Sequence, residues 1–402
     1  MRRRAAGRVG RAVVAALATV ALAGCGAVDA LAGRPQPTWV PKPEGPPPAD
    51  VPTPELPGVP GGGPGTPGAP GGPESPGQPD DPNVVAVGLR EPWGLALLPD
   101  GSAIVGERAS GRILEVQPLR RPVRELMRVP GVDASGGGGL LDLALSPGYR
   151  QDGLVFAYLT TRTDNRVVRF SVGGPVTPVL TGIPRGRTGN GGRLAFGSDG
   201  LLYIGTGDAG RPGQAPDPRT LAGKVLRITT FGRPAPGNPN PASPVWTRGH
   251  RNIAGLCPDG RGQVYATESA AVGDEVNRLV AAKDYGWPVP ALGTRAGAVG
   301  PALTLPAQTT GAAGCAVLDH GLFVAALRGQ RLWAVPLDGA GAPGRPRALL
   351  NSTYGRLRTV VAAPDGALWL TTANRDGVGK PAPQDDRVIR ILPPANTTNS
   401  PV

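Results

Sequence analysis

Lysine, histidine, cysteine and aromatic residues are all scarce in this chain of 402 residues. The chain has four lysines in a Lys and Arg total of 42, two histidines, three cysteines and 4% aromatic residues. Glycine (63) and proline (49) are far above average usage, whereas the charged helix formers Glu and Lys are few. Together with the recurring Asp-Gly and Pro-x-Gly turns, this composition favours many short strands over helices.

Several catalytic signatures are also missing from the sequence. It contains no G-x-S-x-G elbow, H-E-x-x-H helix, P-loop or Cys-x-x-Cys pair, so nothing supports a serine hydrolase, zinc protease or nucleoside triphosphatase. The segment GTGDAG is rich in glycine, but it follows a predicted strand without opening a helix. We therefore do not expect a dinucleotide site there.

The formal net charge of +12 does not predict a nucleic-acid-binding surface. Five arginines lie within the first eleven residues, and subtracting them leaves about +7 for the rest of the chain. No basic run with interleaved aromatic residues follows Arg11. We therefore expect no nucleic-acid partner.

The N-terminus has the pattern of an export signal. The first arginines precede an apolar run over residues 12–23, which is shorter than the roughly 20 residues that a membrane-spanning helix needs. The sequence Leu22-Ala23-Gly24-Cys25 is typical of a bacterial lipobox, in which the cysteine is diacylated. We expect residues 1–24 to be a lipoprotein signal peptide and Cys25 to anchor the protein outside the cytoplasm through lipid. An ordinary signal peptide with an incidental cysteine is the alternative.

The remaining segments divide by composition. Residues 25–83 are dominated by proline and glycine and show almost no apolar periodicity, which predicts a disordered linker. Residues 84–393 carry a repeated pattern of short apolar strands, and residues 394–402 are a short tail.

The pattern over residues 84–393 repeats six times, as a strand, a Pro-Asp-Gly-type turn, an alternating strand and a further strand. Its turn glycines are 45 to 61 residues apart, at Gly101, Gly153, Gly200, Gly260, Gly321 and Gly366. Repeats of this length predict an all-β fold, a six-bladed β-propeller of four-stranded antiparallel blades. A β-sandwich or a solenoid stays open, because periodicity does not show that a ring closes. We expect residues 84–87 to pair with the last blade and fasten the closure.

Cys257 and Cys315 both stand just before a turn, at similar places in neighbouring repeats. In an exported protein such a pair predicts a disulfide. Two buried free thiols are the alternative.

Arginines recur where the loops of different repeats would meet at the axis of a propeller. Arg251, Arg328, Arg356 and Arg358 come from three separate repeats. Converging guanidinium groups would form a positive well for a multiply anionic ligand, because they pair bidentately with carboxylates.

Six motifs fall in the order found in soluble glucose/sorbosone dehydrogenases. They are GGRLAFGSDGLLYIGTGDAG, LAGKVLRI, GHRNIAGL, GDEVNRL with AKDYGWP, LRGQRLW and GRLRTVVAAPDGALW. Over roughly residues 84–392 the chain resembles this family of six-bladed propellers, which use pyrroloquinoline quinone (PQQ) and calcium. With its lipobox and Pro/Gly spacer, it more narrowly resembles lipoprotein members of the family from mycobacteria and other actinobacteria.

The resemblance implies a set of cofactor and metal residues. It implies that PQQ is held by Arg251, Asn252, Arg328, Arg356 and Arg358. It also implies calcium near Glu275 and Tyr285, with main-chain oxygens supplied by Ala270 and Ala271, where the family has Gly-Pro. His250 belongs to the family's GHRN motif, and the resemblance implies a structural role for it.

One position departs from the family pattern in the segment that opens blade three. The family has a histidine two places before the Gly-Gly pair and nineteen before the aspartate of the GD loop, and counting back from Asp208 gives Gly189. The resemblance implies that this histidine takes the proton of the substrate hydroxyl and that Asp208 is its usual partner. Losing such a base costs about 10²- to 10⁴-fold in rate. The glycine run after Ser135 likewise lacks the family's Gln or Glu.

We therefore expect an exported lipoprotein with a degenerate dehydrogenase-like propeller that binds a PQQ-like polyanion or an envelope sugar. An active PQQ- and calcium-dependent oxidoreductase acting on a sugar or alcohol is one alternative. A protein-docking scaffold is another. The sequence does not indicate an oligomeric state.

Overall fold

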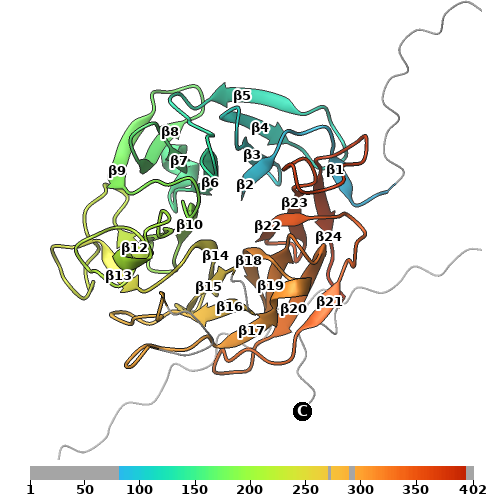
Figure 1. The fold of residues 1–402 in the computed structure, drawn as a ribbon. Helices are drawn as coiled ribbons and strands as arrows, with labels where there is room; N and C mark the ends of the chain where they lie inside the picture. The colour runs from blue at the N-terminus through green and yellow to red at the C-terminus, as the bar shows by residue number, and fades with distance from the viewer. Residues whose placement is uncertain (1–80, 270–272, 289–294, 395–402) are drawn as a thin grey trace, which may run out of the picture. The chain divides into compact units, whose positions relative to one another are not determined.

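The computed structural model describes residues 81–269, 273–288 and 295–394, which form six four-stranded antiparallel sheets arranged in a ring (Figure 1). The all-β six-bladed propeller is confirmed, and the sandwich and solenoid alternatives are wrong. The signal peptide, Cys25, most of the linker, Ala270, Ala271 and most of the tail lie outside the described residues.

Each blade is one sheet whose strands pair in chain order, except that the last blade takes its outer strand from the start of the chain. Blade 1 consists of β2 (Pro92–Leu97), β3 (Ala103–Glu107), β4 (Arg112–Val116) and β5 (Arg124–Arg128). Blade 2 consists of β6 (Leu140–Leu145), β7 (Leu154–Thr160), β8 (Asn165–Ser171) and β9 (Thr177–Ile183). Blade 3 consists of β10 (Arg193–Phe196), β11 (Leu202–Gly205), β12 (Lys224–Ile228) and β13 (Val245–Arg248).

The second half of the ring repeats this plan. Blade 4 consists of β14 (Ile253–Pro258), β15 (Val264–Glu268), β16 (Gly273–Arg278) and β17 (Leu303–Pro306). Blade 5 consists of β18 (Ala312–Leu318), β19 (Gly321–Ala326), β20 (Arg331–Pro336) and β21 (Arg347–Leu349). Blade 6 consists of β22 (Leu357–Ala362), β23 (Leu368–Thr372), β24 (Val388–Ile391) and β1 (Val84–Ala86).

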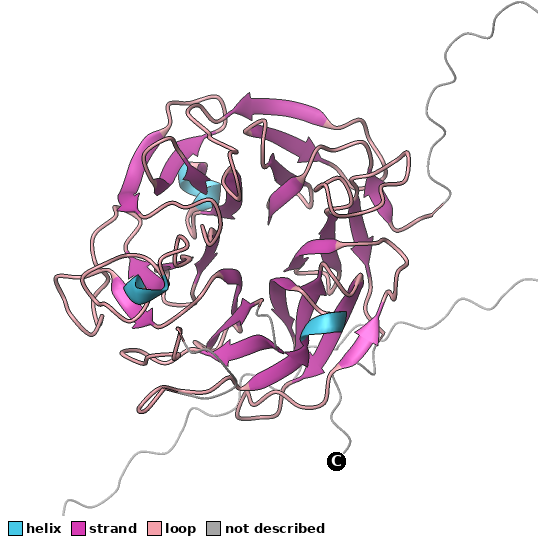
Figure 2. Ribbon diagram, in the orientation of Figure 1, coloured by secondary structure: helices cyan, strands magenta, loops and turns pink. Residues whose placement is uncertain are grey.

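Helical structure in the described residues is limited to three short pieces (Figure 2): α1 (Tyr149–Asp152), η1 (Pro212–Gln214) and η2 (Ala307–Thr309). None of the helices in this part of the chain is long and apolar enough to cross a membrane.

The ring closes through the strand that the sequence assigned to this role. β1 pairs antiparallel with β24, with Val84 opposite Ile389. Val85 packs in one apolar cluster with Leu95 of blade 1 and Trp369 of blade 6. The first and last blades are therefore joined by hydrogen bonds and by a shared core.

The first hairpin of blade 3 shows why these short segments become strands. Leu194 of β10 pairs with Ile204 of β11, and the connecting turn contains Gly200 at φ +71°. Both apolar side chains pack against blade 2, in a cluster that includes Phe156 and Tyr158. Because side chains alternate between the two faces of a strand, Leu194 and Ile204 lie on the same face of the hairpin, and blade 2 covers that face.

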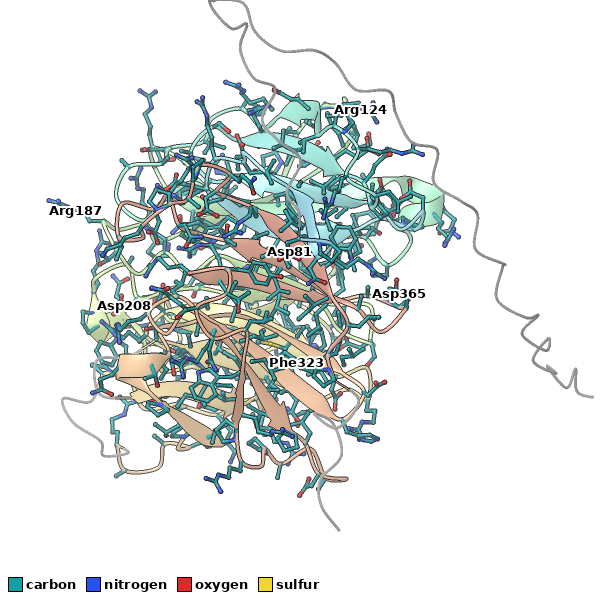
Figure 3. All side chains as sticks on the ribbon, turned by 90° about the vertical axis from the view of Figure 1, so that its right-hand side faces the viewer. Asp81, Arg124, Arg187, Asp208, Phe323 and Asp365 are labelled. Atoms are coloured by element: carbon teal, nitrogen blue, oxygen red, sulfur yellow. A yellow bond between two sulfur atoms is a disulfide. The ribbon has the colours of Figure 1, made fainter. Side chains whose placement is uncertain are left out.

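All first strands begin at the same end of the ring, which we call the mouth. Because the strands alternate in direction, the loops before each first strand and those between second and third strands both lie at the mouth. The first hairpin turns lie at the opposite end, which we call the rear face. Viewed from the side, Arg187 and Asp208 lie at one end and Asp365, from a hairpin turn, at the other (Figure 3).

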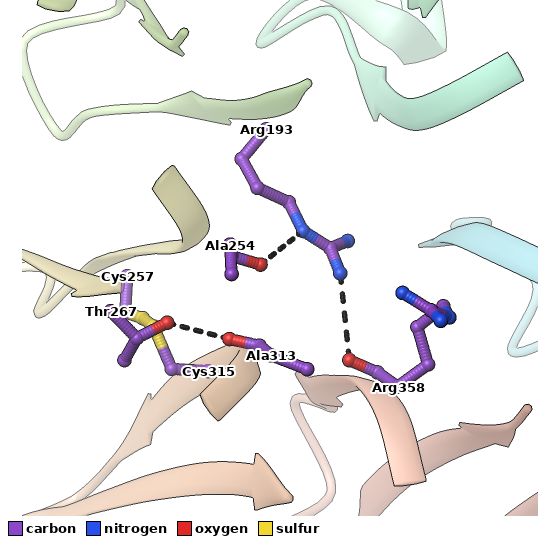
Figure 4. Close-up of a disulfide and its surroundings, with 7 residues drawn as sticks. All are labelled: Arg193, Ala254, Cys257, Thr267, Ala313, Cys315 and Arg358. Carbon is purple, nitrogen blue, oxygen red and sulfur yellow. Dashed lines mark hydrogen bonds between the residues drawn. A yellow bond between two sulfur atoms is a disulfide. The ribbon is translucent and has the colours of Figure 1, made fainter. Parts of the chain in front are cut away.

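Cys257 and Cys315 are bonded in the structure, as the sequence predicted. They lie on β14 and β18, the first strands of two neighbouring blades, with a sequence separation of 58 residues. The bond therefore staples blades 4 and 5 next to the ring axis (Figure 4).

Replacing both cysteines by serine should lower the free energy of unfolding by about 4 kcal/mol, from the entropy of closing a loop of this length. Urea denaturation of the double variant measures this, with the wild-type protein under reducing conditions as the control. A loss below about 1 kcal/mol would contradict the loop-closure account of what this disulfide contributes to stability.

Candidate functional site

The candidate residues converge at the mouth, in loops and strand ends of blades 3, 4, 5 and 6. Arg356 and Arg358 lie where blade 6 begins, and Arg251 and Asn252 directly precede blade 4. Asp208 follows the second strand of blade 3, and Arg328 follows the second strand of blade 5.

Four arginines form a cluster at the centre of this mouth. We define the arginine cluster as Arg108, Arg193, Arg356 and Arg358, whose charges interact in the folded ring. The Arg358 guanidinium carbon lies 3.5 Å from the centroid of the Trp93 ring, and that of Arg108 lies 5.6 Å from it. The side chain of Arg358 is 9% exposed, so its charge is held away from water.

The cluster has more cations than counter-ions among the described residues. Arg108 pairs with Glu91 at 2.9 Å and Arg193 with Asp142 at 3.5 Å. Arg356 and Arg358 share one carboxylate, Asp376, at 2.7 and 3.7 Å. Four guanidinium groups therefore face three carboxylates, and Arg358 has the weakest partner of the four.

The electrostatics of Arg358 reflect this imbalance. Burial, together with the neighbouring arginines of the cluster, lowers its pKa from 12.5 to about 9, against the opposing effect of Asp376. A buried cation without a close partner is costly, and an anionic ligand would remove that cost.

At the base of the cluster, Arg193 lies across the ring axis (Figure 4). Its guanidinium donates to the carbonyl oxygens of Ala254 at 2.5 Å and Arg358 at 3.4 Å, and to Thr359 Oγ1 at 3.1 Å. Burial raises the pKa of its partner Asp142 to about 6, although Arg193 opposes the rise. Arg193, Asp142 and Thr359 line a cavity bounded by the first strands of all six blades. Arg193 thus ties blades 3, 4 and 6 together under Arg358.

Gly189 and Asp208 face each other at the mouth. A Cβ atom added to Gly189 would lie 2.4 Å from Asp208 Oδ1, and Gly189 has φ +67°. The buried Asp208 carboxylate accepts hydrogen bonds from the Trp287 indole at 2.9 Å and from the Gly210 amide at 2.8 Å. The carboxylate therefore occupies the space into which a side chain at position 189 would extend.

The glycine run after Ser135 wraps tightly around two arginine segments. The Arg108 guanidinium donates to the carbonyl oxygen of Gly138 at 2.8 Å, and a Cβ on Gly139 would lie 2.5 Å from the Arg108 carbonyl oxygen. A Cβ on Gly136 would lie 2.6 Å from the Arg187 carbonyl oxygen. Larger residues do not fit at these positions, so this loop provides backbone to the mouth where the family pattern has a polar side chain.

The loop that holds Arg251 and Asn252 is organised by the buried Glu268. This carboxylate accepts hydrogen bonds from His250 Nδ1 at 2.6 Å and from the amides of Arg251 at 2.7 Å and Asn252 at 3.3 Å. Burial acts to raise the pKa of Glu268, but His250 and the amides outweigh it and leave the pKa lowered. His250 is fully buried and stacks on Tyr285, which supports its structural interpretation.

Replacing Glu268 by glutamine should destabilise the folded protein by about 2–4 kcal/mol, because an amide NH₂ group would face these donors in a buried site. Urea denaturation in the presence of a chelator measures the loss. Glu275→Gln is the matched control. Glu275 lies opposite Glu268 on the neighbouring strand β16. Burial and the charge of Glu268 raise the pKa of Glu275. If the two variants lose the same stability, Glu268 does not organise the loop.

The side chains of this loop point toward the blade 3 loops. Asn252 Oδ1 accepts from the Gly191 amide at 2.9 Å. The exposed Arg251 guanidinium lies 5.4 Å from the Trp287 ring, so it is near the indole that bonds to Asp208. Arg251, Asn252, Trp287 and Asp208 therefore form a second group beside Gly189.

Arg328 is less closely joined to these groups. It is exposed and donates to the carbonyl oxygen of Ala307. The preceding residue, Leu327, accepts from Arg356 at 3.3 Å, so the loop of Arg328 adjoins the arginine cluster.

The calcium prediction is supported by few side chains. The Tyr285 hydroxyl donates to Arg278 O at 2.7 Å and accepts from the Val280 amide at 2.9 Å. No group of three or more Asp, Glu, His or Cys residues that could hold a metal ion is found in the described ranges. The main-chain oxygens assigned to Ala270 and Ala271 lie outside those ranges, so the calcium site stays a prediction.

Sequence reasoning missed four residues of this site: Arg108, Arg193, Trp93 and Asp376. Arg193 stands inside the quoted GGRLAFG motif, where its position after the glycine pair was the available signal. Trp93 lies in β2, and Arg108 and Asp376 lie in loops that follow second strands. None of the three carries a distinguishing sequence pattern, and only the closed ring brings them to Arg358.

Comparison with known proteins identifies similar chains. The family model described as Glucose / Sorbosone dehydrogenase matches residues 89–380. The solved structure of the PQQ-bound form of an aldose sugar dehydrogenase from Streptomyces coelicolor is 43% identical, with a TM-score of 0.74, and covers 76% of this chain and 95% of that one.

Two further relatives are more distant. Quinoprotein glucose dehydrogenase B of Acinetobacter calcoaceticus is 30% identical over 246 residues, which are 51% of this chain and 52% of that protein. The chain therefore spans about half the length of that relative. Aldose sugar dehydrogenase YliI of Escherichia coli is 27% identical over 331 residues, 72% of this chain and 89% of that protein.

Proposed function

The chain belongs to the glucose/sorbosone dehydrogenase family, and from this premise we propose that it is an exported lipoprotein that binds PQQ or a similar polyanion at its mouth and oxidises sugars poorly. The observation that carries the proposal is the arginine cluster, which holds four guanidinium groups against three carboxylates.

The residues present fit a tricarboxylate such as PQQ. Arg358 and Arg356 offer guanidinium donors whose one shared counter-ion, Asp376, leaves a positive charge to be balanced. Arg251 and Asn252 lie at the same mouth and would hold other polar atoms of the ligand. PQQ, when bound, supplies the two-electron acceptor for oxidation of an alcohol. The calcium that the family implies would be bound near Glu275.

Poor turnover is proposed because of position 189. A base must reach the substrate hydroxyl within hydrogen-bonding distance, and glycine offers no side chain for this purpose. Asp208 is directed instead to the Trp287 indole and the Gly210 amide, which hold its carboxylate in place. The mouth therefore retains groups that bind and orient an anion but lacks a group at position 189 that would take up the proton.

An active sugar dehydrogenase is the second candidate, favoured by the 43% identity to the PQQ-bound Streptomyces coelicolor enzyme. In that case Asp208, released from Trp287, would have to take up the proton itself.

Two assays on the chain from Glu74 to Val402, which forms one compact unit, separate these functions. Calorimetric titration with PQQ and calcium should give saturable binding. Reduction of a redox dye with a panel of aldoses should be at least about 100-fold slower than with the Streptomyces coelicolor enzyme assayed in parallel. Absence of binding would contradict the proposal, and comparable dye reduction would favour the active enzyme.

The membrane anchor is tested separately. In the full chain, Cys25→Ser should move the protein from the membrane fraction to the soluble fraction. An unchanged distribution would contradict lipidation at this cysteine.

A further inference from the structure

The exposed apolar side chains of the ring are concentrated at one end. Of the six large hydrophobic residues that are exposed in the described chain, five directly follow the third strand of a blade. Leu119 is 87% exposed, Phe231 74%, Leu392 67% and Val172 41%. Third strands run in the same direction as first strands, so these residues lie at the rear face, opposite the mouth.

Contacts join these turns into an arc over neighbouring blades. Arg169 of blade 2 donates to Thr230 O at 3.0 Å, and its guanidinium lies 5.2 Å from the Phe231 ring of blade 3. Between blades 1 and 2, Arg150 donates to Pro99 O at 3.5 Å. Contacts at the rear face therefore link blade 1 to blade 2 through their first hairpin turns, and blade 2 to blade 3 beside Phe231.

The charged residues in these turns are all basic. Residues 117–123, 172–176 and 229–236 contain three arginines, among them the exposed Arg121 and Arg233, and no Asp or Glu. Nearby acidic residues in the hairpin turns are engaged locally: Asp100 accepts from Ser102 at 2.6 Å and Asp199 from Arg227 at 2.8 Å. The three turns that carry Leu119, Val172 and Phe231 thus present apolar and basic side chains and no carboxylate.

The chain joins the ring beside this arc. Strand β1 runs toward the mouth, so the residues before Val84 lie toward the rear face on the outer rim. Arg120, from the turn that carries Leu119, donates to the carbonyl oxygen of Asp81. Leu392 follows β24, the strand that pairs with β1. Residues 81–83 therefore lie next to the turn of Leu119 and to the end of β24.

We propose that the rear-face arc, formed by Leu119, Arg121, Val172, Phe231, Arg233 and Leu392, is a docking surface for an anionic phospholipid membrane. Arginines attract anionic headgroups, each contributing about a fivefold gain in binding, and apolar tips enter the interface between headgroups and acyl chains. We infer a membrane as the partner of this surface because the proposed lipid anchor would hold the protein at one. Docking in this way turns the mouth away from the bilayer, where it is open to ligands in the surrounding medium.

Vesicle sedimentation of the unlipidated chain from Glu74 to Val402 tests this surface independently of the anchor. Vesicles of equal parts phosphatidylglycerol and phosphatidylcholine should bind the protein, and vesicles of phosphatidylcholine alone should bind it at least tenfold more weakly. Leu119→Ser with Phe231→Ser should weaken binding about tenfold, and Arg121→Gln with Arg233→Gln about 25-fold, at about fivefold for each arginine.

The matched control variant changes two residues at the mouth, the end of the ring opposite the rear face. Val378, 74% exposed, and the exposed Arg162 both lie in loops between second and third strands, at the mouth. Val378→Ser with Arg162→Gln should leave vesicle binding unchanged. Absence of binding to anionic vesicles, or equal losses in rear-face and control variants, would overturn the proposal. Retained membrane localisation of the lipidated chain in that case would show that the anchor acts without this surface.

Discussion

Replacing Arg358 by methionine should weaken PQQ binding by at least about 30-fold, because a fully desolvated, charge-assisted contact is worth roughly 2–5 kcal/mol. The same change should leave the unliganded protein equally stable or more stable by about 1–3 kcal/mol, since it replaces a buried cation with an apolar side chain of similar length. Arg358 is 9% exposed and its nearest carboxylate, on Asp376, is 3.7 Å away. Calorimetry and thermal denaturation measure the two effects.

The opposite signs of these effects distinguish a binding role from a structural one. Arg187→Met, at an exposed arginine of the same end of the ring, is the control and should change neither quantity appreciably. A large loss of stability in Arg358→Met with unchanged affinity would contradict the account.

The affinity for an anionic ligand should change with pH as the Arg358 guanidinium loses its proton. Its pKa in the unliganded ring is about 9, against 12.5 for a free arginine. A bound anion raises that pKa, so affinity should be full below pH 9 and fall by up to about tenfold per pH unit above it. Titrations between pH 7 and 10.5 test this, and Arg358→Met should remove the dependence. A flat profile in the wild-type protein would contradict the assignment.

Gly189→His should raise the rate of sugar oxidation by at least tenfold over Gly189→Ala, and by at most the 10²- to 10⁴-fold that a general base supplies. Both side chains must adopt the left-handed backbone at φ +67°, which costs about 1–2 kcal/mol, and both must displace Asp208 Oδ1 from their Cβ. The alanine variant therefore has the same backbone strain as the histidine variant but lacks the imidazole base. Dye reduction at saturating PQQ and sugar gives the rates.

The free energies of unfolding of Gly189→His and Gly189→Ala show whether both variants fold. Each should lose about 1–3 kcal/mol relative to wild type in urea denaturation. Equal oxidation rates in folded histidine and alanine variants would show that the missing base is not what limits turnover.

The ring itself could be predicted because its signals are local. A turn glycine such as Gly200, at φ +71°, marks most of the first hairpins, and short apolar segments such as Leu202–Gly205 form strands that are buried along their whole length. The closing strand and the disulfide also followed from position, since β1 precedes the first repeat and the two cysteines stand at equivalent points.

The charge balance of the site could not be predicted from the sequence. It depends on which carboxylate each arginine meets, and Asp376 serves both Arg356 and Arg358 from 18 or more residues away. The sequence grouped Arg328 with these arginines, whereas its side chain bonds to Ala307 O. The bond from Trp287 to Asp208, across 79 residues, likewise arises only when blades 3 and 4 are packed together.

Binding without efficient turnover is tested most directly by the absorbance of the bound quinone after rapid mixing with excess sugar. The account predicts that the PQQ-loaded wild-type protein retains the oxidised spectrum for at least about 100-fold longer than the Streptomyces coelicolor enzyme, with faster reduction in Gly189→His. Reduction of the wild-type protein as fast as that of the relative would contradict it.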